Sequence, residues 1–279
     1  MRILLTGSSG FVGSHLHQAL CDLSHEVIPC SRASGVDFNN MLTAEDWLPH
    51  LNDIDVVINC VGIIAETRTQ HFRQLHQLAP ITLFDACQRC GIHKVIQISA
   101  LGADDTAFTP YQLNRKVADD FLRASTLNWA IIQPSLIYGE GSKSFRLFQL
   151  MAKLPLIAVP GNGEYLVQPV HISDVVRAVL ASVTTDNASK KTIAAVGTEA
   201  VSYKQWLQTI RNSLGKKPAL IIPIPFTLLF MMSKVFWTLF PLFSEDNLKM
   251  LQAGNSASAA DFTQLLQRPP LSVEEGLKQ

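Results

Sequence analysis

The sequence predicts an α/β fold built on a doubly wound parallel sheet, with a small, partly helical region toward the C-terminus. Two observations support this prediction. Short apolar segments alternate with amphipathic segments of helical period through the first half of the 279 residues. The first apolar segment also runs directly into three glycines, Gly7, Gly10 and Gly13, which open a helix.

Each predicted strand is rich in Ile and Val and lacks the alternation of a half-exposed strand, as expected where helices cover both faces of a sheet. The predicted strands are Arg2–Thr6, Glu26–Cys30, Asp55–Cys60, Lys94–Ser99 and Trp129–Gln133. The predicted helices between them are Gly10–Leu23, Thr43–Leu51, Thr69–Cys90 and Pro110–Ser125. Repeated strand–helix units with right-handed crossovers give a doubly wound sheet.

The pattern changes after Pro134. Glycine and proline at residues 160–163 predict a tight turn between two strands, Leu156–Val159 and Tyr165–Val170. The remaining predicted elements are the helix Ser173–Ser182, the strand Lys191–Val196 and the helix Ser202–Leu214. We therefore predict a main domain of residues 1–140, to which residues 170–197 return, and a smaller region formed by residues 141–169 and 198–279.

The composition argues against several classes of protein. Lys plus Arg equal Asp plus Glu at 23 each, which argues against nucleic acid as the main partner, because a phosphate backbone requires a basic face. Apolar residues make up 47% of the chain, which does not suit a disordered protein. The five cysteines do not suit a disulfide framework, and Cys87 and Cys90 lack a second pair, so we expect no metal site. No secretory signal precedes the first strand, and we expect a cytoplasmic protein.

The glycine turn predicts a site for a diphosphate. Gly7 allows the tight turn, Gly10 allows a phosphate to approach the backbone, and Gly13 allows the helix to pack closely on the strand. The amino end of the helix presents unpaired N–H groups and the positive end of the helix dipole. The residues expected to hold the pyrophosphate of a dinucleotide are Gly7, Ser9, Gly10, Phe11, Val12 and Gly13.

The end of the second predicted strand indicates which dinucleotide binds. An acidic residue there accepts hydrogen bonds from the ribose of NAD, whereas an arginine pairs with the 2′-phosphate of NADP. The sequence has Arg32 and no acid, which favours NADP(H) over NAD(H); the alternative is a solvated surface arginine. Asp37 and Phe38 follow and are expected to flank the adenine. The small residues that end the third strand, and that let its backbone lie along the ribose, are Cys60, Val61 and Gly62.

A capping box formed by Thr109 and Gln112 starts the fourth predicted helix and puts Tyr111 in its first turn. Arg115 lies about 40° around the helix axis from Tyr111, and Lys116 lies about 140° away. A cation beside a phenol lowers the pKa of the phenol. Tyr111 is therefore a candidate acid–base group toward a carbonyl, and the alternative is an exposed tyrosine at the surface.

Several segments, taken together, resemble one superfamily. They are the glycine turn Thr6–Gly13, the small-residue turn Cys60–Gly62, Ser99 at the end of the fourth strand, and Tyr111 on the next helix. This set resembles the short-chain dehydrogenase/reductase superfamily. Two further segments resemble the extended, atypical branch of this superfamily, Ile131–Gly139 and Val170–Asp174. This branch includes NAD-dependent epimerases and dehydratases. Three segments are similar to bacterial relatives of the nucleotide-binding accessory subunit of respiratory complex I. They are Ile98–Ala103, Asn247–Asn255 and Glu274–Leu277.

The resemblance implies a Rossmann fold and a catalytic Tyr-x-x-x-Lys motif. Here Arg115 stands where the family has lysine, and Lys116 follows it. Arginine is permanently protonated and cannot relay a proton as lysine can, so either Arg115 supplies only charge or Lys116 takes the role. Ser99 would polarise the carbonyl of the substrate, or it only ends a strand. The residues that the resemblance puts along the nicotinamide are Pro134 and Ser135.

The segment Ile221–Phe243 is strongly apolar, but prolines interrupt it and Lys234 lies within it. Its longest uninterrupted stretch is shorter than the roughly 20 residues that a membrane-spanning helix needs. We predict a buried helix or one face of an oligomer. The alternative is a helix that lies on a membrane surface.

These observations favour an NADP(H)-dependent oxidoreductase that acts on an apolar carbonyl or quinone-like small molecule. The C-terminal part is rich in Phe, Leu and Met and poor in charge, which favours such a substrate over a sugar nucleotide. One alternative is a non-catalytic nucleotide-binding module that docks on a membrane-associated or respiratory partner, peripheral to the inner membrane, through Ile221–Phe243. Another alternative is a sugar-nucleotide epimerase or dehydratase.

Overall fold

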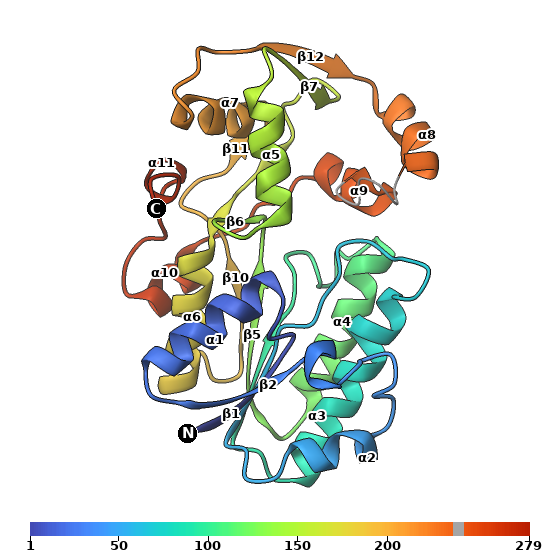
Figure 1. Ribbon diagram of the computed structural model, residues 1–279, viewed down its shortest axis with the longest axis vertical. Helices are drawn as coiled ribbons and strands as arrows, with labels where there is room; N and C mark the ends of the chain where they lie inside the picture. Colours follow the sequence, from blue (N-terminus) through green and yellow to red (C-terminus); the bar gives the residue numbers. More distant parts are fainter. Residues whose placement is uncertain (237–242) are drawn as a thin grey trace. The chain divides into compact units, whose positions relative to one another are not determined.

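The computed structural model describes residues 1–236 and 243–279 (Figure 1). They form two compact units. Unit 1 consists of residues 1–134 and 175–194, and unit 2 consists of residues 135–174 and 195–279. The division predicted from the sequence assigns residues 135–140, 170–174 and 195–197 to the main domain, whereas in the structure these segments are part of unit 2.

Unit 1, every residue of which is described, contains a six-stranded sheet with the strand order β10-β5-β4-β3-β1-β2. Its strands are β1 (Arg2–Thr6), β2 (Glu26–Cys30), β3 (Val56–Asn59), β4 (Lys94–Ile98), β5 (Asn128–Pro134) and β10 (Lys191–Ala195). Neighbouring strands from β2 to β5 run parallel. The chain moves from β1 to β2 on one side and returns to β3 on the other, so the predicted doubly wound sheet is confirmed.

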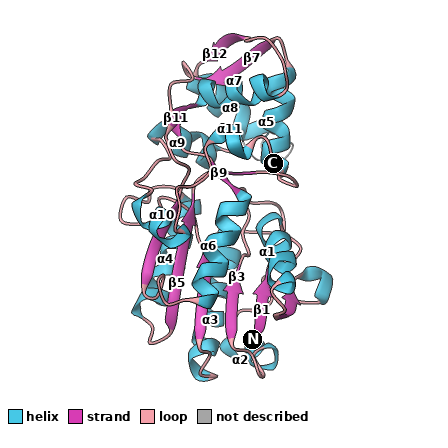
Figure 2. Cartoon of the chain, turned by 90° about the vertical axis from the view of Figure 1, so that its left-hand side faces the viewer, coloured by secondary structure: helices cyan, strands magenta, loops and turns pink. Residues whose placement is uncertain are grey.

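Helices cover both faces of this sheet (Figures 1 and 2). Helices α2, α3 and α4 lie on one face, and α1 and α6 lie on the other. The helical elements are α1 (Phe11–Asp22), η1 (Arg32–Ser34), α2 (Ala44–Trp47), η2 (Leu48–His50), the π-helical η3 (Arg73–Leu78), α3 (Ala79–Arg89), α4 (Pro110–Ala124) and α6 (Ile172–Thr184). The helix predicted at Thr69–Cys90 therefore starts later, at Arg73, and its first part has a wider turn than an α-helix.

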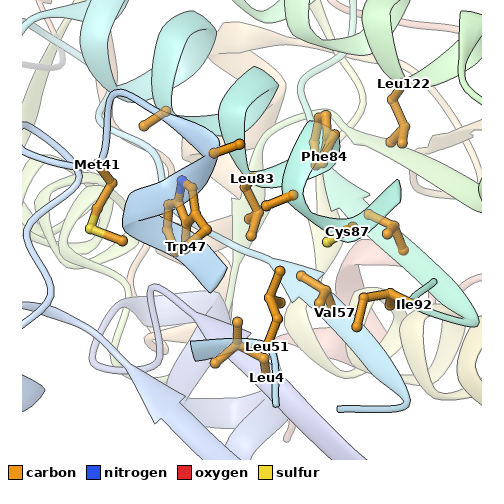
Figure 3. Close-up of a cluster of buried hydrophobic side chains, with 14 of the residues drawn as sticks. Leu4, Met41, Trp47, Leu51, Val57, Leu83, Phe84, Cys87, Ile92 and Leu122 are labelled. Carbon is orange, nitrogen blue, oxygen red and sulfur yellow. The ribbon is translucent and has the colours of Figure 1, made fainter. Parts of the chain in front are cut away.

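A continuous apolar core fills the space between the sheet and α2–α4 (Figure 3). Leu4 and Val57 extend from β1 and β3 toward this side of the sheet. They pack in one cluster with Trp47, Leu83 and Phe84, and each of these five side chains is at most 1% exposed. This core holds β1 and β3 together, and the loops that follow both strands start from the same edge of the sheet.

The strands of unit 2 are short and pair two by two. They are β6 (Ile137–Tyr138), β7 (Leu156–Pro160), β8 (Leu166–Val167), β9 (Val170–His171), β11 (Val201–Ser202) and β12 (Leu220–Ile224). The helices are α5 (Lys143–Lys153), α7 (Tyr203–Ser213), α8 (Phe226–Phe236), α9 (Glu245–Ala253), α10 (Ala260–Leu266) and α11 (Val273–Gly276). Aromatic residues form the centre of this unit, where Tyr138, Phe148 and Trp206 are at most 2% exposed.

The two strands that flank residues 160–163 do not pair with each other. The tight turn is present, because the amide of Gly163 donates a hydrogen bond to the carbonyl of Pro160 (3.0 Å). However, β7 pairs in parallel with β12, from Leu156 opposite Leu220 to Pro160 opposite Ile224. The strand after the turn, β8, has two residues and pairs with β11 instead. The five-residue β12 offers β7 more cross-strand pairs than β8 does, and this long-range partner is not visible in the local sequence.

Within Ile221–Phe243 the described residues do not form one buried helix, whereas the other half of that expectation, one face of an oligomer, stays a prediction. Residues up to Ile224 form strand β12, and Pro225 separates this strand from α8. A residue before proline is disfavoured in helical conformation, which explains why the chain stays extended up to Ile224. On α8, Leu228, Met231 and Met232 are 45%, 69% and 45% exposed. Part of the prediction, residues 237–242, lies outside the described residues. None of the described helices combines the length and the hydrophobicity needed to span a membrane.

Candidate functional site

The turn between β1 and α1 requires glycine at two positions. Gly7 has a φ of 68°, and a Cβ on it would lie 2.8 Å from the carbonyl carbon of Cys60. A Cβ on Gly13 would lie 2.2 Å from the carbonyl oxygen of Gly7. At Gly10 such a Cβ would lie 3.1 Å from the carbonyl oxygen of Gly7, a close contact that is less severe than the one at Gly13. The absence of side chains leaves the turn open for a ligand to approach the backbone.

The amino end of α1 carries positive dipole charge that no side chain offsets. Gly10 is the N-cap and provides no capping group, and the first turn contains no acidic residue. The first N–H groups of a helix have no partner inside the helix. The amides of Phe11, Val12 and Gly13 are therefore available to an anion such as a diphosphate.

A cavity of about 150 Å³ lies beside this turn. Predicted site residues that line it come from the loops after three neighbouring strands: Gly7, Ser9 and Gly10 after β1, Arg32, Asp37 and Phe38 after β2, and Cys60, Val61 and Gly62 after β3. Lining residues that the sequence does not predict are Ser31, Val36, Ile63, Gln70 and Leu75. Ordinary ligand pockets have volumes of about 300–1,000 Å³, so this cavity accommodates one part of a dinucleotide.

Arg32 provides a positive charge at this cavity. It begins the short helix η1, which the amide of Ser31 stabilises by donating a hydrogen bond to the Ser34 hydroxyl (2.8 Å). Among the described residues no carboxylate forms an ion pair with the Arg32 guanidinium group. A phosphate is the kind of ligand that such a group binds in two-point geometry.

Asp37 and Phe38 differ in their exposure to this cavity. The Asp37 carboxylate accepts a hydrogen bond from the amide of Asn39 (3.0 Å) within its own loop. The Phe38 ring is 4% exposed and packs edge-to-face on Trp47, with the ring centroids 5.0 Å apart. Phe38 therefore belongs to the core and forms part of the cavity wall, and its ring is not free to stack on a base.

The small-residue turn after β3 is held by buried hydrogen bonds. The Thr6 hydroxyl donates a hydrogen bond to the side-chain oxygen of Asn59 (2.6 Å). The side-chain amide of Asn59 donates a hydrogen bond to the side-chain oxygen of Gln97 (2.7 Å). The amide of Val61 donates to the same Asn59 oxygen (3.3 Å). Burial raises the pKa of the Cys60 thiol, so this thiol stays protonated and is a poor nucleophile.

Tyr111 and Arg115 lie together, as the helical spacing predicts. The guanidinium carbon of Arg115 lies 5.1 Å from the centroid of the Tyr111 ring. Arg115 is 6% exposed, and its Nη1 donates a hydrogen bond to the carbonyl of Ile98 (3.0 Å). Its Nη2 also lies against Gly62, because a Cβ on Gly62 would be 2.2 Å from this atom. Arg115 therefore connects Tyr111 to the turn that lines the glycine cavity.

Two further aromatic residues from outside α4 surround Tyr111. Its ring contacts Phe72 and His76 edge-to-face, with centroid distances of 5.5 and 5.3 Å. Burial, together with the positive charge of Arg115, holds the pKa of His76 well below its ordinary value, so the imidazole is neutral. The amide of Ile63 donates to His76 Nε2 (3.0 Å), which assigns the proton to Nδ1. No described residue accepts a hydrogen bond from this buried Nδ1.

Ser99 does not face the cavity with a free hydroxyl. It donates a hydrogen bond to Oδ2 of Asp119 (2.6 Å), to which the side chain of Gln133 also donates (3.3 Å). Burial raises the pKa of Asp119 to about 6, although these hydrogen bonds and the nearby arginines oppose the shift. In this arrangement Ser99 supports a buried carboxylate on α4.

The structure does not bring Lys116 to Tyr111. The Lys116 ammonium group forms ion pairs with Asp120 (2.6 Å) and Asp105 (3.2 Å). Lys116 therefore lies with a different set of residues, in agreement with its predicted angle around the helix. Of the two candidate cations, only Arg115 contacts the Tyr111 ring.

Pro134 and Ser135 mark the first crossing of the chain from unit 1 to unit 2. Pro134 ends β5, and its carbonyl accepts a hydrogen bond from the amide of Leu101 (2.9 Å). The Ser135 hydroxyl donates to the carbonyl of Gln168 (2.5 Å). Neither residue lines the cavity beside the glycine turn.

Gln70, His76 and Asp119 are among the residues of this region that the sequence does not predict. Gln70 lies in a loop without a motif, and His76 lies in the π-helical segment η3, where ordinary helical spacing does not apply. Asp119 is a carboxylate in the middle of an amphipathic helix, where an exposed position is the ordinary expectation. Asp119 lies on the helix that carries Tyr111 and Arg115, and its side chain is fully buried.

Residues 3–197 match the family described as the NAD dependent epimerase/dehydratase family. The matched segment includes all of unit 1 except its first two residues. The chain belongs to this family.

Curated members similar to this chain have diverse names. The ceramide reductase of Caulobacter vibrioides is 24% identical over 239 residues, which cover 80% of this chain and 74% of that protein. The mitochondrial NADH dehydrogenase (ubiquinone) 1 alpha subcomplex subunit 9 of Dictyostelium discoideum is 21% identical over 234 residues. This match covers 78% of the chain, and the chain spans 65% of that subunit. The predicted resemblance to the respiratory subunit is thus confirmed.

Solved structures of epimerase/dehydratase type share the fold. MoeE5, in complex with UDP-glucuronic acid and NAD, matches with a TM-score of 0.76 at 19% identity, covering 100% of this chain and 97% of that chain. The UDP-glucuronic acid 4-epimerase of Bacillus cereus, in complex with the same two ligands, has a TM-score of 0.73 at 20% identity, with 100% and 97% coverage. At these identities the likeness concerns the fold. The open glycine turn of this chain, its unpaired helix amides and Arg32 fit the nicotinamide dinucleotide for which the family is named.

Proposed function

We propose that this chain is an NADP(H)-dependent oxidoreductase that acts on the carbonyl of an apolar or quinone-like small molecule. The observation that supports a reaction, beyond nucleotide binding, is the contact of Arg115 with both the Tyr111 ring and the backbone of Gly62. Gly62 lines the cavity beside the glycine turn. A candidate acid–base group and a fixed positive charge are thus linked to the candidate cofactor site.

The residues of unit 1 would hold the cofactor in three parts. The amides at the start of α1 bind the diphosphate, and the small-residue turn Cys60–Gly62 lies along a ribose. Arg32 pairs with the 2′-phosphate, which favours NADP(H) over NAD(H). The nicotinamide, when bound, supplies or accepts the hydride.

The proton would be handled by Tyr111. Its hydroxyl donates a proton to the carbonyl oxygen of the substrate, or accepts one in the reverse direction. Arg115 stabilises negative charge on the Tyr111 phenol but does not move a proton itself, because its guanidinium group stays protonated. Since the Ser99 hydroxyl is hydrogen-bonded to Asp119, we assign Ser99 a positioning role and do not assign it the polarisation of the carbonyl.

The relatives support an apolar substrate but leave other classes to be tested. One relative is named a ceramide reductase, whereas the solved structures contain UDP sugars. The C-terminal part of the chain, rich in Phe, Leu and Met and poor in charge, favours the first class. A sugar-nucleotide epimerase or dehydratase is the alternative reaction.

A non-catalytic nucleotide-binding module is the second candidate function. The arginine at the position of the family's lysine favours it, because this substitution removes a proton relay. The similarity to a subunit of NADH dehydrogenase adds support. In this case the exposed apolar side chains within Ile221–Phe243 would contact a protein partner or the surface of the inner membrane from the cytoplasm.

An assay of NADPH oxidation distinguishes the reductase from the nucleotide-binding module. The assay uses a panel of a long-chain ketone, a short-chain quinone and a UDP sugar. The reductase predicts turnover with the ketone or the quinone. Tyr111→Phe should then lower kcat by about 10²–10⁴-fold and leave the Kd for NADPH unchanged. The matched control is Tyr165→Phe, which removes a hydroxyl in unit 2. No turnover with any substrate, together with tight NADPH binding, would support the module.

A further inference from the structure

A second cavity lies within unit 2, and the proposed reaction does not use it. Its volume is about 460 Å³, which is within the range of ordinary ligand pockets. Strands β7 and β12 and helix α8 form much of its wall, with Ala158, Ile224, Leu228 and Met232 among the lining residues. Of the described lining residues, only Ser233 has a polar side chain, and its hydroxyl donates to the carbonyl of Phe230 in the same helix (2.9 Å). The cavity therefore offers apolar contact without a free hydrogen-bonding side chain.

An exposed apolar strip leads along the sheet to this cavity. Side chains alternate across a strand, and residues paired in register point to the same face. Leu156 pairs with Leu220, and Ala158 pairs with Ile222, so these four side chains share one face of the β7–β12 pair. Leu156, Leu220 and Ile222 are 50%, 66% and 37% exposed. Ala158 belongs to this strip and also to the wall of the cavity.

Positive charge is concentrated on the segments that form this region. Residues 141–163 and 200–244 contain eight Lys and Arg and no Asp or Glu, and one of these cations, Lys204, forms an ion pair with Glu164 just outside the first segment. Lys153 precedes β7, and Lys216 and Lys217 precede β12. Because β7 and β12 run parallel and in register, these cations lie at the same end of the pair. All three are exposed, and none forms an ion pair within the described part of the chain.

The cations and the cavity thus lie at opposite ends of one apolar strip. The cations precede the first pair, Leu156 with Leu220, whereas the cavity is lined by residues of the last pair, Pro160 with Ile224. Five residues of a strand span about 13 Å. A ligand that matches this arrangement has one negative charge at one end and a long apolar chain.

We propose that unit 2 binds a single long-chain fatty acid. Its hydrocarbon chain lies along the β7–β12 face and enters the cavity, and its carboxylate lies near Lys153, Lys216 and Lys217. A sugar or nucleotide does not fit, because its hydroxyl groups would lose water without gaining hydrogen bonds in the cavity. A second copy of the chain does not fit either, because the same positive charge on both copies would repel. The proposal concerns binding alone and does not depend on the proposed reaction.

The test measures binding of saturated fatty acids of 8 to 16 carbons to the full chain by calorimetry, below their micelle concentrations. We expect one site, with an affinity that rises about fourfold per added CH₂ until the cavity is filled. Met232→Trp places a large side chain in the cavity and should weaken binding at least about tenfold. Met231→Trp is the matched control, because Met231 is 69% exposed and does not line the cavity, and it should bind within about twofold of the wild type.

Charge-reversal variants test the position of the carboxylate independently of the cavity. Lys216→Glu with Lys217→Glu should weaken a fatty acid about tenfold and leave the alcohol of equal chain length unchanged. If Met232→Trp does not fold, as judged by its thermal unfolding, Leu228→Trp replaces it, since Leu228 also lines the cavity. The proposal is rejected by the absence of saturable binding, by equal loss in Met231→Trp and Met232→Trp, or by binding that occurs only to vesicles. A dimer that Met232→Trp dissociates would also reject it in favour of a second copy.

Discussion

The guanidinium group of Arg115 packs directly against the backbone of Gly62, so that a Cβ on Gly62 would lie 2.2 Å from Nη2. Arg115 is held there from two other directions. Its Nη1 donates to the carbonyl of Ile98, and the Tyr111 ring lies against its guanidinium carbon. The arginine thus joins the loop after β3, the end of β4 and the first turns of α4. Arg115 stands at the position where the superfamily motif has lysine, and its charge there is permanent.

This contact predicts that Gly62 and Arg115 are energetically coupled. Gly62→Ala should lower the free energy of unfolding by about 1–3 kcal/mol, because the methyl group displaces Arg115 from the Ile98 carbonyl. In an Arg115→Ala background the same substitution should cost at least about 1 kcal/mol less. Urea unfolding of the four proteins of this double-mutant cycle measures the coupling. Strictly additive effects would show that the contact is absent in solution.

The glycine turn predicts different outcomes for two neighbouring substitutions. Gly10→Ala should lower the free energy of unfolding by no more than about 1 kcal/mol, since its Cβ would lie 3.1 Å from the Gly7 carbonyl oxygen and a shift of the turn by a few tenths of an ångström relieves this contact. It should nevertheless weaken NADPH binding at least about tenfold, because its methyl group lies where a phosphate approaches the backbone. Gly13→Ala should reduce both stability and binding, because its Cβ would lie 2.2 Å from the Gly7 carbonyl oxygen. Paired unfolding and NADPH titrations check both variants, and unchanged NADPH affinity in Gly10→Ala would contradict the site.

Asp119 predicts a pH dependence of stability. Burial raises its pKa to about 6 in the folded protein, above the ordinary value of 3.8, so between these pH values the folded state holds a proton that the unfolded state has released. The stability from this group is therefore fully present below about pH 4 and is lost as the pH rises through about 6. Asp119→Asn lacks this loss, so it should gain about 2–3 kcal/mol relative to the wild type between pH 4 and pH 7. Unfolding in urea across this range measures the difference, and parallel curves for the two proteins would contradict the assignment.

The sequence predicts the elements whose evidence is local. Strands β1 and β2 have the predicted bounds, and α4 starts at Pro110 as its capping box requires. The partner of β7 could not be predicted, because Leu220–Ile224 lies about sixty residues further along the chain and no local pattern specifies long-range pairing. The exposure of the α8 side chains could not be predicted for a related reason, because an apolar segment predicts burial unless its surroundings are known.

The candidate site divides in the same way. The proximity of Tyr111 and Arg115 follows from helical spacing within one element, so the sequence suffices. The partner of Ser99 does not follow, because Asp119 comes from a different element and meets Ser99 only when β4 and α4 pack together. His76 escapes prediction because the π-helical segment η3 alters the spacing that would relate it to Tyr111 and Arg115. The functional roles of these residues remain predictions.

The central claim is that the glycine turn and Arg32 of unit 1 hold NADP(H). The most direct measurement is the titration of the wild type and of Arg32→Ala with NADPH and with NADH, followed by calorimetry. We predict that the wild type binds NADPH more tightly than NADH. We also predict that Arg32→Ala weakens NADPH about 10–100-fold and changes NADH by less than about threefold. Equal losses for the two nucleotides, or no saturable binding of either by the wild type, would contradict the claim.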